Sequence, residues 1–180
     1  YTLSLHDALP IFSKEGSDFL DSLQKRPNTI PIVVSGRSAK SIEKAFGHIK
    51  LNIATEHGAK YFSIVEREWH DLVHSDKSSW YNEALEAISM YTNRTPESYF
   101  EAKEYSITWH YRNSPVEFSN FMARKLMGLL EQGLSNRPVS VIPGKKAVEI
   151  RATEANKGVF TNWIRNEFIH NDPDTIIVAM

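Results

Sequence analysis

The chain has no cysteine among its 180 residues. This absence excludes a disulfide framework and a thiol nucleophile, and it agrees with a reducing compartment. No apolar run approaches the roughly 18 residues of a membrane-spanning helix, and no basic segment followed by an apolar one suggests a secretory signal. We therefore expect a cytoplasmic protein with no membrane partner.

The chain also has no excess of charge of either sign. Its 21 Lys and Arg residues stand against 22 Asp and Glu residues, which gives a net charge of −1. Nucleic-acid-binding proteins usually carry a basic excess on one face, so we expect no nucleic-acid partner. An apolar content of 41% with four Trp residues indicates a packed core rather than disorder.

The first eleven residues differ from the rest of the chain. They have no regular hydrophobic period, and Pro10 stands just before the first good helical pattern. Tyr-Thr-Leu-Ser-Leu-His-Asp-Ala-Leu-Pro-Ile is also a codon-by-codon translation of a common short-read sequencing adapter. We interpret residues 1–11 as a cloning or assembly artefact and leave them out of fold reasoning; the alternative is a native N-terminal strand. On this interpretation the natural protein begins upstream of Phe12.

The rest of the chain is organised around an apolar run that ends in Ser-Gly-Arg. Thr29–Val34 predicts a buried strand, Ala39–Phe46 a helix and Leu51–Thr55 a second strand, which together predict a parallel sheet. Ligands of such sheets bind beyond the carboxyl ends of the strands. Ser35 stands at that end, beside a glycine and a helix N-terminus, so it is a candidate phosphate ligand. Taken alone, Ser-Gly at a strand end is more typical of a turn.

Residues 59–151 show a different pattern, with alternating strands separated by two amphipathic helices. The expected strands are 59–64, 68–72, 98–103, 106–111, 139–142 and 147–151, and the expected helices are 80–91 and 115–132. This block predicts an α+β unit inserted into the parallel sheet. The chain then returns to α/β with a helix at 157–169 and an apolar strand at 174–180.

Several charged residues are candidates for ligand binding. Glu101 and Lys103 point to one face of a predicted strand, and Arg112 follows the next strand. Such a face can bind sugar hydroxyls, but the pattern alone favours a solvated salt-bridge face of little energetic value. Glu149 has the same two interpretations. His57 ends a predicted strand, where it is either an acid–base group or a partner of the backbone.

Lys157 lies in the first turn of the last predicted helix, directly after Asn156. A cation there opposes the helix dipole. We therefore favour a role in binding phosphate over that of an exposed lysine that tolerates a small penalty. His48, His70, His74, His110 and His170 lack metal-ligand spacing, and Asp172-Pro-Asp174 is typical of a turn rather than a metal pair. The sequence predicts no metal ligand within this chain.

Taken in order, five motifs resemble the trehalose-6-phosphate phosphatases of the haloacid dehalogenase superfamily. They are Val33-Val34-Ser35-Gly36-Arg37, Glu56-His57-Gly58, the stretch from Glu101 to Arg112, Gly144-Lys-Lys-Ala-Val-Glu-Ile-Arg151 and Asn156-Lys157-Gly158. The resemblance covers residues 12–180. It implies an α/β fold with a Rossmann-like core, incomplete at both ends, formed by residues 12–58 and 152–180. Residues 59–151 would be an inserted α+β cap.

Members of this family hydrolyse trehalose 6-phosphate to trehalose and phosphate with the help of Mg²⁺. The resemblance implies that Ser35 and Lys157 hold the phosphoryl group, and that closure of the cap excludes water. It implies substrate-binding roles for Arg37, His57, Glu101, Lys103, Arg112 and Glu149.

The chain departs from the family in lacking the nucleophilic Asp-x-Asp-Gly-Thr motif and the acidic Gly-Asp-Asp motif of the Mg²⁺ site. We expect the first upstream of Phe12 and the second after Met180, so these residues alone should release no phosphate. Two alternatives stay open. One is a non-catalytic module of a trehalose-6-phosphate synthase, fused or associated, that serves assembly or sugar-phosphate sensing. The other is a related phosphatase acting on sucrose phosphate or a phosphorylated polyol.

Overall fold

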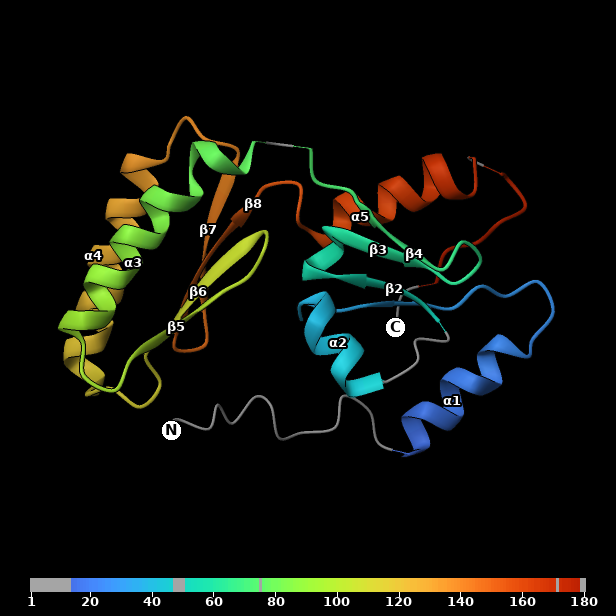
Figure 1. Cartoon of the computed structure of the whole chain (residues 1–180), viewed down its shortest axis with the longest axis horizontal. Helices are drawn as coiled ribbons and strands as arrows, with labels where there is room; N and C mark the ends of the chain where they lie inside the picture. Colours follow the sequence, from blue (N-terminus) through green and yellow to red (C-terminus); the bar gives the residue numbers. More distant parts are fainter. Residues whose placement is uncertain (1–13, 47–50, 75, 171, 179–180) are drawn as a thin grey trace.

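A computed structural model describes residues 14–46, 51–74, 76–170 and 172–178 of the chain. Within these ranges the strands form two four-stranded sheets, each with its own helices, and the two units lie side by side (Figure 1). None of the described helices is both long and apolar enough to cross a membrane. The expected mixed α/β fold is confirmed.

The first unit has a sheet covered by helices on both faces. Its strands, in spatial order, are β1 (Ile32–Val34), β2 (Asn52–Thr55), β3 (Lys60–Ser63) and β4 (Glu68–Asp71). Its helices are α1 (Lys14–Gln24), α2 (Ala39–Phe46) and α5 (Lys157–Trp163). Helix α5 continues as a π-helical turn over Ile164–Phe168. Strands β1 and β2 are parallel, as expected, and the other pairs are antiparallel. Ile53 packs with Ile42 of α2, whereas its neighbour Ala54 packs with Phe160 of α5. Ile32 and Val34 pack on one face of the sheet and Val33 on the other, which explains the continuous apolar run in the partly buried β1.

The second unit has an antiparallel sheet covered on one face. Its spatial order is β5 (Tyr99–Ala102), β6 (Ser106–His110), β8 (Ala147–Ala152) and β7 (Val139–Gly144), and its helices are α3 (Tyr81–Arg94) and α4 (Val116–Gly133). Trp109 and Ile150 face the helices in one apolar cluster with Leu126. Glu101, Thr108 and Glu149 form a row on the opposite face. That polar face points toward the first unit (Figure 1).

Two expectations from the sequence need correction. The inserted unit was expected to begin at residue 59, but β3 pairs with β2 and β4 pairs with β3, so both strands belong to the first sheet. The alternation at 59–64 predicts a strand but carries no information on which sheet it joins. The second correction is that residues 174–178 form no strand, because no described strand pairs with them, and Ile176 is 84% exposed. Residues 1–11, interpreted as an artefact, and residues 179–180 lie outside the described ranges.

Candidate functional site

The two turns that follow the parallel strands are bonded to each other. The backbone N–H of Ser35 donates to the Ala54 carbonyl oxygen at 2.8 Å, and the N–H of His57 donates to the Ser35 carbonyl oxygen at 2.9 Å. The Glu56 N–H donates to the Arg37 carbonyl oxygen at 3.0 Å, while the Arg37 N–H donates to Ser35 Oγ at 3.1 Å. The carboxyl ends of both strands therefore form one rigid platform, where ligands of α/β sheets bind.

The Glu56–Gly58 turn has a strained backbone. Glu56 and His57 have φ angles of 47° and 63°, and Gly58 has a φ of 105°. Each left-handed non-glycine residue costs of order 1–3 kcal/mol, and such residues gather at functional sites. A Cβ on Gly36 would lie 2.7 Å from His57 Cε1, so glycine at position 36 makes room for this imidazole.

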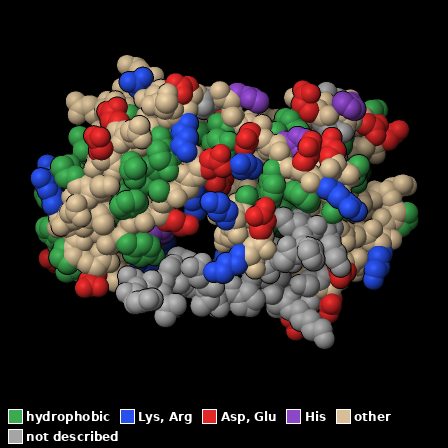
Figure 2. All heavy atoms as spheres, viewed as in Figure 1, with side chains coloured by type: hydrophobic (Ala, Val, Ile, Leu, Met, Phe, Trp, Pro, Cys, Tyr) green, Lys and Arg blue, Asp and Glu red, His purple; other side chains and the backbone are tan. Residues whose placement is uncertain are grey.

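The polar face of the second sheet reaches this platform at two points. The Lys103 ammonium donates to the Gly36 carbonyl oxygen at 3.2 Å, and His57 Nε2 lies 3.5 Å from Glu149 Oε1. Glu101 Oε2 lies 3.7 Å from Lys103 Nζ, and Arg151 and His110 add further contacts to these carboxylates. Figure 2 shows basic and acidic side chains gathered around the hollow between the two units. The expected common face of Glu101 and Lys103 is confirmed.

The Glu149 carboxylate is held in its charged form. Burial acts to raise its pKa, but the hydrogen bond from His57 and the nearby charges of His57, Arg151 and Lys103 outweigh burial and lower the pKa below its ordinary value. The hollow thus presents an ionised acceptor beside several donors. This combination suits a polyhydroxylated ligand that carries an anionic group.

Lys157 begins α5 beside the Glu56–Gly58 turn. The Asn156 side chain caps the helix by accepting the Val159 N–H at 2.9 Å. Helix α5 packs against the turn so closely that a Cβ on Gly58 would meet Phe160 Cβ at 2.5 Å. Lys157 is exposed, and among the described residues its ammonium has no hydrogen-bonding or ionic partner.

The structure places one of the remaining predicted residues, Arg37, on the platform and the other, Arg112, away from it. Arg37 is half-buried in the platform, and its guanidinium contacts no described acceptor. Arg112 is exposed beyond His110, the end of β6 opposite to Lys103, so the structure does not bring it to this group. Sequence reasoning missed Arg151, although its i+2 spacing from Glu149 on one strand places both on the same face.

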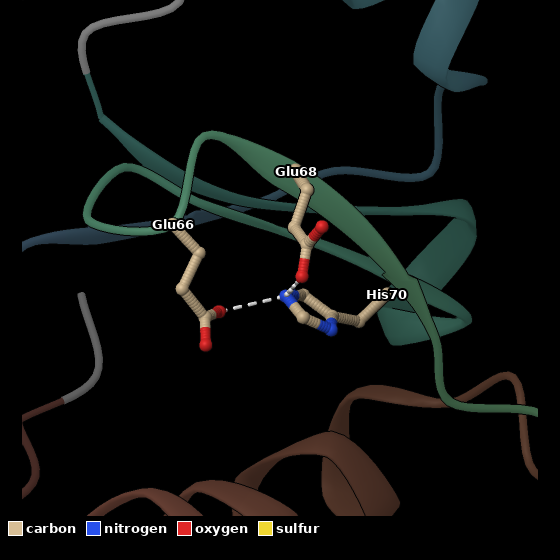
Figure 3. A group of neighbouring side chains, drawn as sticks. All are labelled: Glu66, Glu68 and His70. Carbon is tan, nitrogen blue, oxygen red and sulfur yellow. Dashed lines mark ion pairs between the residues drawn. The ribbon is translucent and has the colours of Figure 1, made fainter.

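A separate group of metal-ligating side chains lies on the β3–β4 hairpin (Figure 3). His70 Nε2 is 2.8 Å from Glu66 Oε2 and 3.8 Å from Glu68 Oε1. The hairpin turn lies at the end of the first sheet opposite to the platform, because β3 runs antiparallel to β2. On the platform itself, the described carboxylate of Glu56 already accepts two N–H groups. The hairpin group is therefore away from the platform, and the Glu56 carboxylate on the platform is already occupied, so neither supplies the oxygen ligands that Mg²⁺ prefers at the platform.

The comparisons with known proteins identify the chain's relatives. The Trehalose-phosphatase family matches residues 6–180, a range that begins inside the segment interpreted as an artefact. The chain belongs to the trehalose-phosphatase family. This confirms the resemblance drawn from the five motifs.

Relatives of this trehalose-phosphatase family member include proteins named as synthases and as phosphatases. An alpha,alpha-trehalose-phosphate synthase [UDP-forming] B from Dictyostelium discoideum is 32% identical over 84% of the chain and 19% of its own length. The trehalose-phosphatase of Zygosaccharomyces rouxii is 31% identical over 70% of the chain and 14% of its own length. The chain thus spans less than a fifth of the length of either relative.

Solved structures share the fold of this family member. The trehalose-6-phosphate phosphatase C-terminal domain of C. albicans has a TM-score of 0.81 and 30% identity, over 91% of this chain and 57% of that one. The C-terminal domain of the Candida albicans trehalose synthase regulatory protein has a TM-score of 0.75 at 15% identity, over 86% of this chain and 55% of that one. The second likeness shows the fold alone.

Proposed function

We propose that the chain is the phosphate- and sugar-recognition part of a trehalose-6-phosphate phosphatase, with the first unit as its core and the second as its cap. The observation that carries the proposal is the pair of contacts between the units, Lys103 to Gly36 and His57 to Glu149. They join the end of a parallel sheet to a charged face in a chain of the trehalose-phosphatase family.

In this proposal the core platform binds the phosphoryl group. The Ser35 hydroxyl and the Lys157 ammonium supply a hydrogen bond and a positive charge to its oxygens, and Arg37 adds a second positive charge from the same platform. Phosphoryl recognition depends mainly on positioning and on neutralising negative charge. The unpartnered cations of Lys157 and Arg37 support these roles, since neither is neutralised by a described carboxylate.

The sugar rings are assigned to the cap face and to His57. Glu149 accepts hydrogen bonds from sugar hydroxyls, His57 and Lys103 donate them, and Glu101 holds the Lys103 ammonium in place at 3.7 Å. Arg112 has no role here, because it lies beyond His110, at the end of β6 away from Lys103. The arrangement encloses a ligand between the units and excludes water from it.

Catalysis needs a nucleophile and Mg²⁺ besides these binding groups. When bound, Mg²⁺ would neutralise charge on the transferring phosphoryl group, but the described platform residues do not form its site. We propose that the chain by itself binds trehalose 6-phosphate and does not cleave it, and that Mg²⁺ acts in the complete protein.

Calorimetric titration of the chain with trehalose 6-phosphate, sucrose 6-phosphate and inorganic phosphate tests this proposal. We expect trehalose 6-phosphate to bind at least about tenfold more tightly than either of the others, a difference of about 1.4 kcal/mol. Glu149→Gln should remove most of this preference while leaving phosphate binding intact. Tighter binding of sucrose 6-phosphate would contradict the proposal and favour a sucrose-phosphatase. Phosphate release by the chain with Mg²⁺ at about 10 s⁻¹ would show that it is a complete enzyme.

The second candidate is a non-catalytic module of a trehalose-6-phosphate synthase. It is favoured by the relatives that are named as synthases and of which this chain matches a small part. Such a module would serve assembly or sugar-phosphate sensing, and a sensing module would also bind trehalose 6-phosphate, so binding alone does not separate the candidates. They differ in whether the full-length protein releases phosphate, which an assay of that protein with Mg²⁺ decides.

A further inference from the structure

The Glu56 carboxylate is a buried charge that the proposed binding site does not use. Glu56 is only 2% exposed, and its side chain points from the core toward the cap. Its Oε2 accepts the backbone N–H of Tyr105 at 2.8 Å, and its Oε1 accepts the N–H of Glu104 at 3.4 Å. Both donors belong to the turn that connects β5 to β6. A carboxylate of one unit is thus bound to the backbone of the other.

This β5–β6 turn is fixed from several directions. The Tyr105 hydroxyl donates to Asp71 Oδ1 at 2.9 Å, and the Lys60 ammonium lies 2.9 Å from Glu104 Oε2 and 3.2 Å from Asp71 Oδ1. On the cap side, the Tyr81 hydroxyl donates to the Lys103 carbonyl oxygen at 2.6 Å. Glu56 is the buried charged residue of this group.

Burying a carboxylate is costly. Burial raises the pKa of Glu56, and the two N–H bonds and the charge of Lys103 offset only part of this effect. An apolar side chain at this position would avoid the cost. The two N–H bonds need an acceptor at this place, however, and a carboxylate accepts both.

We propose that Glu56 is a positioning residue that holds the β5–β6 turn on the core and thereby places Lys103 over the Gly36 loop. Lys103 directly precedes Glu104, and its ammonium bonds the Gly36 carbonyl oxygen at 3.2 Å. The Gly36 loop is in turn bonded to the turn that carries Glu56. These contacts form a closed ring between the two units. The role of Lys103 in sugar binding rests on the proposed function, but the geometric part of this inference does not.

The geometric part is tested without any ligand. Because the chain has no cysteine, Lys40→Cys on α2 and Arg124→Cys on α4 provide two exposed sites for spin labels, one on each unit. We expect a narrow distance distribution in this labelled chain and a distribution at least about twice as broad once Glu56→Ala removes the acceptor for both N–H groups. Glu86→Ala, at an exposed site on α3, is the matched control and should change nothing. An unchanged distribution in a folded Glu56→Ala variant would overturn the inference.

If Glu56→Ala does not fold, as judged by circular dichroism, Glu56→Gln decides. Its amide oxygen still accepts a hydrogen bond, but bonds to a charged acceptor are roughly twice as strong. We expect hydrogen exchange at the Tyr105 amide to be about tenfold faster than in the parent chain, with little change at the Trp109 amide. Equal exchange at Tyr105 in the two proteins would overturn the inference.

A double-mutant cycle with Lys103→Met then tests the effect on the ligand. Glu56→Ala should weaken trehalose 6-phosphate binding about tenfold in the parent chain and less than about twofold in Lys103→Met, because it acts through that lysine. Inorganic phosphate binding should be unchanged. Equal weakening in both backgrounds, or of both ligands, would show that Glu56 does not act through Lys103. If the parent chain binds no trehalose 6-phosphate, the proposed function fails, while the distance and exchange measurements still decide the geometric part.

Discussion

The Gly36 carbonyl oxygen accepts a hydrogen bond from the Lys103 ammonium at 3.2 Å, across 67 positions of sequence. This contact fixes the loop after β1 to the polar face of the second sheet. The imidazole of His57 packs against the same glycine and reaches Glu149 in the second unit. Gly36 therefore serves both cross-unit contacts, one through its carbonyl group and the other through its missing side chain.

Gly36→Ala is expected to destabilise the fold by about 1–3 kcal/mol, because the new methyl group overlaps the His57 ring at 2.7 Å. The displaced imidazole would also lose its contact with Glu149, so trehalose 6-phosphate binding should weaken. Gly128→Ala is the matched control, since a Cβ there meets nothing within 4 Å. In the middle of α4 it should stabilise by about 0.5–1 kcal/mol. Urea denaturation measures both changes, and equal stability of the two variants would contradict the prediction.

Protonation of Glu149 in acid should remove part of the stability of the fold. Its folded-state pKa is lowered, so its contribution is present above the ordinary value of 4.5 and is lost as the pH falls through the folded pKa. We expect Glu149→Gln to be less stable than the parent chain at pH 7, with the difference shrinking below about pH 4.5. Denaturation curves between pH 7 and 3 measure this. A constant difference across the range would show that Glu149 does not titrate as proposed.

The contribution of Glu56 to stability should depend on pH in the opposite direction. Its folded-state pKa is raised, so the folded state binds more protons than the unfolded state, and stability falls as the pH rises from 4.5 through the folded pKa. Glu56→Gln does not titrate, so its stability relative to the parent chain should increase over this window. Denaturation curves in the same series of buffers measure both variants. If the stability of each variant relative to the parent chain changed with pH in the same direction for Glu56→Gln and Glu149→Gln, one of the two assignments would be contradicted.

The sequence predicted local structure and the faces of strands, except at residues 174–178, where the expected strand is absent. The alternation at Tyr99–Lys103 placed Glu101 and Lys103 on one face, and the contact between them confirms it. Helical periodicity likewise predicted α2 over Ala39–Phe46. Both signals are local, because each depends on residues a few positions apart.

The relations that the sequence did not predict are non-local. Nothing in residues 59–71 tells which sheet the hairpin joins, because both sheets have an edge that would accept it. The direction of Glu56 depends on a left-handed backbone at a non-glycine residue, which sequence patterns do not indicate. Arg112 was grouped with Glu101 and Lys103, whereas the antiparallel pairing places it beyond His110, at the end of β6 away from Lys103.

Lys157 provides a test in which stability and binding should change in opposite directions. Its cation stands in the first turn of α5 without a described partner, so Lys157→Met should stabilise by about 0.3–1 kcal/mol through relief of the unfavourable dipole interaction. The same change should weaken inorganic phosphate binding about tenfold, since one charge-assisted contact is lost. Lys44→Met, in the last turn of α2, is the matched control. It removes a favourable dipole interaction and should slightly destabilise the fold without affecting phosphate. Unchanged phosphate affinity in Lys157→Met would remove this lysine from the proposed site.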